Sequence, residues 1–515
     1  MQSTKLNYVL GFIFTICLLL FFTAGIFFNH SIDITEIHSL IIYGACCVIP
    51  KDTIQKIMIL CGGLTLIAIE LLFSFGDIYL FGTQILLMSA LFFFSKDKKV
   101  TLPYFIIGLS FLLHLFYIQH TDIDTRQHDI RGIIYYMNEI VKDGFNFFNF
   151  NPWDMYYAFH QPLYFWIIGQ INVAEIMLFG SHLVALEGLQ YVSLFLVTAT
   201  IVYAFAILKL LKFDCKIISI ILTFIAFNPT LVLFSGYISD DTMVLFWSVF
   251  TIYHFLCWYC DENFSHIILS ALGFGLGVLT KLSLLMITPA FAVLLFLKLI
   301  QSNDKTKAWI DIFTFICIAV PLGLFWILRN HILFDMQFFN VPDTSPNGQN
   351  FFHLSFVERF FDFSMIFTPF INAPEIVDGN MWLALIKTEL FGEWNLSLIN
   401  PYIIIPATCL YVLNICIKLS VLFGILFYLF RNPLKQGEVW IFFVLQYLII
   451  WGYSFIYALD YPYICSSDYR LFAQLILPEF ILLSSLYQKE TAKNIFSVVS
   501  FIYGVSVATI YVMIC

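Results

Sequence analysis

Charged residues are scarce in this 515-residue chain, where Asp, Glu, Lys and Arg together make up only 11% of the residues. A soluble domain carries about 25%, so this shortage excludes a soluble enzyme. Basic residues are also outnumbered, because 25 Lys and Arg face 34 Asp and Glu for a net charge of −9. A chain without a basic surface cannot neutralise phosphates along a nucleic acid, so no nucleic-acid partner is expected.

Hydrophobic residues take the place of the missing charges, at 61% of the chain with 19% aromatic residues and a mean hydropathy of +0.89. A membrane-spanning helix needs about 20 apolar residues. On this rule the sequence predicts an all-α integral membrane protein, a multi-helix bundle with about 13 to 15 spans. The predicted spans cover 8–28, 36–50, 57–75, 78–95, 102–119, 183–211, 217–234, 240–260, 265–282, 284–300, 309–328, 402–430, 438–458, 470–487 and 494–514.

Basic residues near span ends indicate the orientation, because they remain on the cytoplasmic side. With the N-terminus inside, 16 of the 25 basic residues fall on that side. They are Lys5, Lys51, Lys56, Lys96, Lys98, Lys99, Lys209, Lys212, Lys216, Lys298, Lys305, Lys307, Arg431, Lys435, Lys489 and Lys493. This orientation predicts that two long non-spanning segments, 120–180 and 331–401, lie outside the cytoplasm. We name them the first and second long loops.

Both long loops are rich in acidic and aromatic residues, and segments such as IIYYMNEIVKDG have apolar residues at helical spacing. Loops of this length are usually functional, and amphipathic helices of this kind lie along a membrane surface. The expected organisation is an N-terminal four-helix module (1–100), a catalytic core (101–330) that includes the first long loop, the second long loop (331–401), and C-terminal spans (402–515). No internal repeat is evident.

Polar residues gather in short clusters at the predicted outer ends of the spans. Such residues are expensive in a membrane unless they serve a site or a pathway. The clusters are TDIDTRQHDIRG with Asp122, Asp124, His128 and Asp129, AFHQPLYFW with His160, SGYISDDTM with Asp240 and Asp241, GLGVLTKLS with Lys281, and CSSDYRLF with Asp468 and Arg470.

Each cluster also has a plain structural interpretation. Asp240 could be a helix N-cap, Lys281 could extend its amine to the lipid headgroups, and Arg470 could simply pair with Asp468. Lys418, inside the run 402–430, could mark a break between an interfacial segment and a span. These interpretations weaken because all five clusters are predicted on one side of the membrane.

Taken together, the clusters suit sugar transfer from a lipid-phosphate donor. A carboxylate can take the proton from an attacking hydroxyl, and Lys and Arg can stabilise a departing phosphate. Aromatic residues of the loops offer stacking faces for a sugar.

The order of these motifs resembles the GT-C superfamily of polyprenyl-phosphate-sugar glycosyltransferases, which includes protein O-mannosyltransferases and the lipid A aminoarabinose transferase. The resemblance covers roughly residues 100–330, with a weaker echo at 465–480. Its motifs are HDIRGIIYY followed by FHQPLYFW, then NPTLVLFSGYISDD with Asp240 in place of the usual Asn, then GLGVLTKLS.

The resemblance implies a GT-C-type fold and a role for each candidate residue. Asp129 would be the general base, Lys281 and Arg470 would contact the donor phosphate, and Asp241 would position Lys281. His128 and His160 would contact substrate. Arg126 and Arg131 flank Asp129 in the sequence and are expected to keep it ionised.

The donor would be a dolichyl- or undecaprenyl-phosphate-linked sugar, and the acceptor a protein, a lipid or a glycan. The membrane would be the bacterial inner membrane or that of the endoplasmic reticulum, with the active site extracytoplasmic. We assign no metal ligands, but the DxD pair Asp122 and Asp124 is a competing assignment that would bring a divalent cation. The four additional N-terminal spans depart from the family pattern.

Two other classes of function compete with the transferase. In a transporter or lipid flippase the same charges would line a path, but such proteins show internal repeats and charges at mid-membrane. The second competing class is a scaffold subunit with a degenerate site. The clustering at one boundary favours the enzyme.

Overall fold

A computed structural model describes residues 98–127, 129–144, 150–153, 159–338, 354–372, 378–430, 437–461, 464–487 and 489–515. The predicted N-terminal module and its four spans, and His128, lie outside the described residues. Within the described part the elements are all helices, with no strand. Nine of these helices are long and apolar enough to cross a membrane, or ten with one bent pair. The predicted all-α membrane fold is therefore confirmed.

Every span predicted from residue 102 onward coincides with one helix or with two or three consecutive helices. They are α5 (Lys98–Gln119), α8 (His182–Leu210), α9 (Cys215–Ala226) with α10 (Pro229–Gly236), α11 (Asp240–Asp261), α12 (Phe264–Thr280), η2 (Leu282–Ile287) with α13 (Thr288–Gln301), α14 (Lys305–Phe334), α17 (Ile404–Phe430), α18 (Glu438–Asp460), η7 (Tyr469–Leu475) with α19 (Ile476–Leu483) and η8 (Ser484–Leu486), and α20 (Glu490–Met513).

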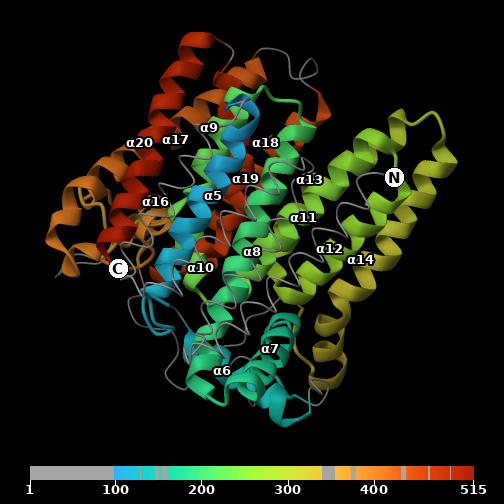
Figure 1. The fold of residues 1–515 in the computed structure, drawn as a ribbon. Coiled ribbons are helices and arrows are strands. Elements are labelled where there is room, and N and C mark those ends of the chain that lie inside the picture. The colour runs from blue at the N-terminus through green and yellow to red at the C-terminus, as the bar shows by residue number, and fades with distance from the viewer. Residues whose placement is uncertain are drawn as a thin grey trace, which may run out of the picture.

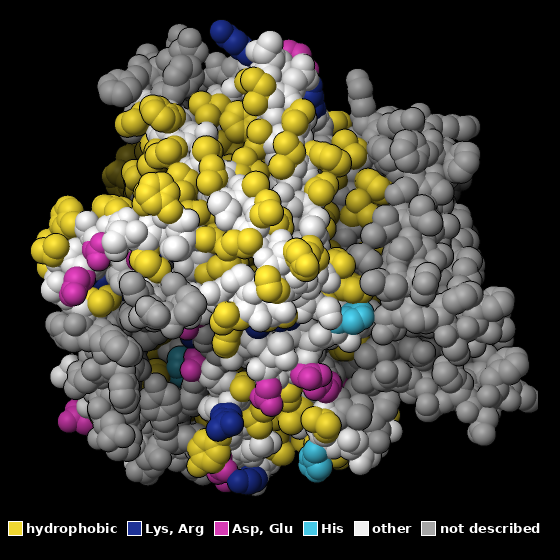
Figure 2. All heavy atoms as spheres, turned by 90° about the vertical axis from the view of Figure 1, so that its left-hand side faces the viewer, with side chains coloured by type: hydrophobic (Ala, Val, Ile, Leu, Met, Phe, Trp, Pro, Cys, Tyr) yellow, Lys and Arg dark blue, Asp and Glu magenta, His cyan; other side chains and the backbone are white. Residues whose placement is uncertain are grey.

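The described spans form one bundle in which α8, α11, α12 and α14 stand next to one another in sequence order (Figure 1). Hydrophobic side chains cover the middle of the face shown in Figure 2, and charged side chains gather mainly towards its ends. This distribution is the one expected of a bundle surrounded by lipid.

The span predicted at 217–234 is bent by 48° between α9 and α10. Pro229 opens α10 and has no backbone N–H to continue the hydrogen bonds of α9. The side chain of Asn228 caps α10 by accepting from the backbone N–H of Thr230 at 3.0 Å. The dipeptide Asn-Pro therefore makes the bend.

The first long loop contains two helices, α6 (Ile130–Lys142) and α7 (Leu163–Phe179), at one end of the bundle (Figure 1). Helix α6 is the amphipathic helix predicted from IIYYMNEIVK. Its residues Ile133, Tyr136 and Ile140 are buried in a hydrophobic cluster that also contains Phe165 of α7.

The second long loop contains α15 (Phe356–Phe360), α16 (Met381–Phe391) and the short η3 (Leu396–Leu398) and η4 (Pro401–Ile403). Helix α16 differs from a helix lying on a membrane surface, because almost all of its side chains are buried. It packs against α10, α17 and η7 inside the bundle. This part of the loop therefore belongs to the protein core.

Candidate active site

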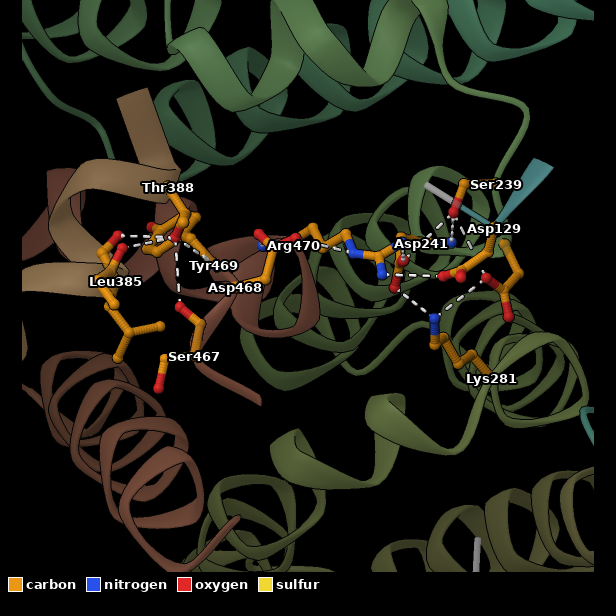
Figure 3. A network of polar contacts seen from close by, with 12 residues as sticks. Asp129, Ser239, Asp241, Lys281, Leu385, Thr388, Ser467, Asp468, Tyr469 and Arg470 are labelled. Carbon is orange, nitrogen blue, oxygen red and sulfur yellow. Dashed lines mark hydrogen bonds and ion pairs between the residues drawn. The ribbon is translucent and has the colours of Figure 1, made fainter. Parts of the chain in front are cut away.

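Charged residues from distant parts of the chain meet at the end of the bundle that carries α6 and α7. We name this set, Asp129, Asp240, Asp241, Lys281, Asp468 and Arg470, the charged cluster (Figure 3). The structure thus brings together Asp129, Asp241, Lys281 and Arg470, which the sequence analysis selected on separate motifs.

Lys281 bridges the two carboxylates at the start of α11. Its Nζ lies 2.6 Å from Oδ1 of Asp241 and 3.1 Å from Oδ1 of Asp240. Helix α12 ends at Thr280, and Lys281 has an extended backbone before η2 begins. This break in the helical backbone sets Lys281 between two helical segments, with its amine directed at Asp240 and Asp241.

The start of α11 fixes the position of both carboxylates. Ser239 is the N-cap, and its Oγ accepts from the backbone N–H of Asp241 at 3.1 Å and lies 3.2 Å from Oδ2 of the same residue. Asp240 is therefore the first residue of the helix rather than its cap, which corrects the structural interpretation of this residue. Carboxylates in a first helical turn are stabilised by the helix dipole.

Arg470 connects three carboxylates through its guanidinium. Nη2 lies 3.0 Å from Oδ2 of Asp129, Nε lies 2.9 Å from Oδ2 of Asp468, and Nη1 lies 3.9 Å from Oδ2 of Asp241. Asp468 also caps η7 by accepting from the backbone N–H of Arg470 at 3.1 Å. The local pair Arg470–Asp468 is therefore present, and it orients the guanidinium towards the first long loop.

Asp129 is the most accessible acid of the charged cluster, with 49% of its side chain exposed against 1% for Asp241. It precedes α6 with a left-handed backbone, at φ 59°, a conformation that Asp tolerates better than most residues. Its ion-pair partner is Arg470. Arg126 donates to Tyr117 and Thr121, and its expected effect on the ionisation of Asp129 stays a prediction.

His160 stands at the edge of the charged cluster, with Nδ1 3.7 Å from Oδ2 of Asp240. Burial lowers the pKa of His160 to about 4, and the attraction of Asp240 offsets this only in part. The imidazole is therefore neutral at physiological pH and suits a hydrogen bond better than an ion pair with a phosphate. His128, the other predicted histidine contact, lies outside the described residues.

The DxD pair lies at the protein surface near Glu187 of α8. Asp122 and Asp124 are exposed on either side of the buried Ile123, and both carboxylates act electrostatically on Glu187 of α8. Among the described residues no three His, Cys, Asp or Glu side chains form a group that could hold a metal ion. The competing assignment of Asp122 and Asp124 stays a prediction.

The sequence analysis missed some members of the site. It named Asp240 and Asp468 in the polar clusters but gave neither a role in the site, and it did not separate Glu393 from the other acids of the second long loop. Burial, then Asp468 and Asp129, raise the pKa of Glu393 to about 7, while Arg470 opposes them. The adjacency of Asp468 to Arg470 was a usable signal, but nothing local in the sequence marks Glu393.

Residues 162–335 match the family model described as dolichyl-phosphate-mannose-protein mannosyltransferase. This part of the chain is a domain of that GT-C family. The domain includes Asp240, Asp241 and Lys281, whereas Asp129 and Arg470 lie outside the matched residues. No curated protein matches the chain. The match and the membrane spans indicate a membrane glycosyltransferase whose donor belongs to the class of polyprenyl-phosphate sugars. The match therefore favours an enzyme over a transporter.

Proposed function

We propose that the chain transfers a sugar from a dolichyl- or undecaprenyl-phosphate donor to an acceptor at the charged cluster, with inversion at the sugar carbon. The observation that carries this proposal is the meeting of Asp129, Lys281 and Arg470 from three separate segments. The domain matched at residues 162–335 supports the class of donor. That family's name makes a protein the favoured acceptor over a lipid or another glycan.

Asp129 acts as the general base in this proposal. Its exposed carboxylate takes the proton of the acceptor hydroxyl while the oxygen attacks the anomeric carbon. The bond from that carbon to the phosphate oxygen breaks, and its electron pair leaves with the polyprenyl phosphate. One attack from the face opposite the leaving group inverts the configuration.

Lys281 and Arg470 stabilise the phosphate as its negative charge grows. Asp240 and Asp241 hold the amine of Lys281 in place, and Asp468 does the same for Arg470. His160, neutral at physiological pH, donates or accepts a hydrogen bond with the substrate, and His128 is proposed as a further substrate contact.

The site lies on the extracytoplasmic side in this proposal. The first turn of α11 belongs to the charged cluster, while Glu262, just beyond the other end of α11, pairs with Lys298 and Lys307. Helix α11 has 22 residues, which corresponds to about 33 Å, roughly the thickness of a bilayer core. The charged cluster and these basic residues thus stand at opposite ends of a span, as the positive-inside rule requires.

The donor-phosphate assignment is tested with Lys281→Ala and Arg470→Ala in lipid nanodiscs. Each variant should weaken binding of dolichyl phosphate or undecaprenyl phosphate by about 2–4 kcal/mol, by analogy with oxyanion donors. Lys298→Ala is the matched control, because Lys298 pairs with Glu262 away from the charged cluster. Unchanged affinity for both lipids in both test variants would remove the assignment.

A further inference from the structure

Helix α16 of the second long loop contacts the segment that carries Arg470. Oγ1 of Thr388, in α16, accepts from the backbone N–H of Tyr469 at 2.9 Å. The same hydroxyl donates within α16 to the carbonyl of Ala384 at 2.8 Å and lies 3.3 Å from the carbonyl of Ser467. Figure 3 shows Thr388 on one side of Tyr469 and Arg470 extending from the other towards Asp129.

The N–H of Tyr469 belongs to the first turn of η7, where backbone donors have no partner within the helix. Tyr469 and Thr388 are both buried, so water cannot easily replace the hydroxyl. A buried donor without a partner is costly. Loss of the Thr388 hydroxyl is therefore expected to shift the first turn of η7. Arg470 directly follows Tyr469 in that turn, so its guanidinium should move as well.

Arg359 of α15 holds the same segment from another direction. Its Nη2 donates to the hydroxyls of Ser466 and Ser467, the latter at 2.6 Å, and its Nη1 donates to the carbonyl of Gly379 at 3.2 Å. Two helices of the second long loop thus contact the residues directly before Asp468.

Helix α16 is itself firmly held. Nζ of Lys387 lies 2.6 Å from Oδ2 of Asp378, and Glu389 is paired with Lys418 of α17 at 2.7 Å. Both ion pairs are buried. They flank Thr388 in the sequence, so its hydroxyl is presented to Tyr469 from a rigid support.

We propose that Thr388 is a positioning residue for Arg470, through which the second long loop sets the affinity of the site for the donor phosphate. This inference rests on the proposed function, in which Arg470 contacts that phosphate. It adds to that function a residue that touches neither substrate nor any side chain of the charged cluster.

The test measures binding of dolichyl phosphate to the full chain in nanodiscs, alongside thermal unfolding. Thr388→Val keeps the shape and removes the hydroxyl, and we expect a roughly tenfold loss of affinity, because the buried N–H of Tyr469 loses its partner and Arg470 shifts with it. Thr388→Ser restores the hydroxyl and should restore affinity. Thr198→Val is the matched control, because Thr198 is buried and its hydroxyl donates only within α8, to Leu194 at 2.8 Å.

Action through Arg470 is tested by a double-mutant cycle. In an Arg470→Gln background, Thr388→Val should cause no further loss of affinity. A further tenfold loss there, a wild-type affinity for Thr388→Val alone, or an equal loss for Thr198→Val would overturn the proposal. If Arg470→Gln alone binds normally, the phosphate assignment fails instead, so the two failures are distinguishable.

Arg359→Lys keeps the proposal testable if Thr388→Val does not fold, because lysine cannot bond both serine hydroxyls and the Gly379 carbonyl in the same geometry. It should also weaken dolichyl phosphate binding, and that loss should again vanish in the Arg470→Gln background. A loss that persists undiminished there would contradict the proposal.

Discussion

At the scale of single residues, the charged cluster contains more negative than positive charge. Asp129, Asp240, Asp241 and Asp468 face only Lys281 and Arg470, and each cation is shared between carboxylates. A donor phosphate entering the proposed site competes with these carboxylates for the two cations. Asp129 is the carboxylate that the phosphate can most easily displace from Arg470, because its side chain is half exposed.

Glu393 gives this charge balance a pH dependence. Because its pKa is raised to about 7, the carboxyl is neutral below that pH and adds a negative charge near Arg470 above it. We predict that the KM for dolichyl-phosphate mannose, whose phosphodiester does not titrate in this range, increases as the pH rises from 6 to 8. Glu393→Gln mimics the neutral form and should flatten the profile.

The control for this prediction is Glu358→Gln, which removes an exposed acid of the same loop, one whose carboxylate accepts from the backbone N–H of Ser355, the N-cap of α15. Its profile should follow the wild type. A Glu393→Gln variant whose KM still rises with pH as steeply as the wild-type value would show that another group is responsible.

At the scale of helices, sequence and structure agree best where hydrophobic length decides the outcome. The spans from residue 102 onward and the amphipathic α6 follow directly from apolar runs and their spacing. The burial of α16 could not be predicted in this way, because Glu389 of α16 meets Lys418 of α17 and Asn228, the cap of α10. Such contacts between distant residues leave no periodic pattern in one sequence, and the same holds for Glu393 beside Asp468.

Lys418 shows most clearly how a contact between distant residues escapes prediction from hydrophobic length. The sequence suggested a break near this residue, but α17 is continuous from Ile404 to Phe430. Nζ of Lys418 lies 2.7 Å from Oε2 of Glu389 and 2.6 Å from Oε2 of Glu479 in α19. The residue therefore joins three helices instead of interrupting one.

We predict that Lys418→Ala strongly destabilises the protein, by about 3–5 kcal/mol, because it leaves two buried carboxylates without their cation. Thermal unfolding in detergent measures the effect. Ser420→Ala on the same helix is the control, since its hydroxyl only donates to Cys416 within α17. An unfolding midpoint for Lys418→Ala equal to that of the control would contradict the structural role of the triad.

At the scale of the whole molecule, one end of the bundle carries the charged cluster and the opposite end carries basic residues paired with acids, such as Lys216 with Glu490 and Lys493 with Asp214. This separation fits the orientation expected from the basic residues of the sequence. The expected side of the membrane remains a prediction.

Single cysteines introduced into a cysteine-free variant test the orientation. We predict that a cysteine at the exposed Asp362, in the second long loop, reacts with a membrane-impermeant maleimide added from the extracytoplasmic side. A cysteine at the exposed Lys305, at the start of α14, should react only after the membrane is permeabilised. The reverse pattern would place the charged cluster on the cytoplasmic side and contradict the proposed topology.

The role of Asp129 tests the proposed function most directly. The measurement compares sugar transfer from dolichyl-phosphate mannose or its undecaprenyl counterpart by Asp129→Asn, Asp122→Asn and Asp124→Asn, together with donor binding by each. Asp129→Asn keeps the shape and removes the base, so we predict that turnover falls by about 10²–10⁴-fold while donor binding persists and the other two variants stay active. Near-normal transfer by Asp129→Asn with loss of activity in Asp122→Asn or Asp124→Asn would assign the chemistry to the DxD pair and contradict the account.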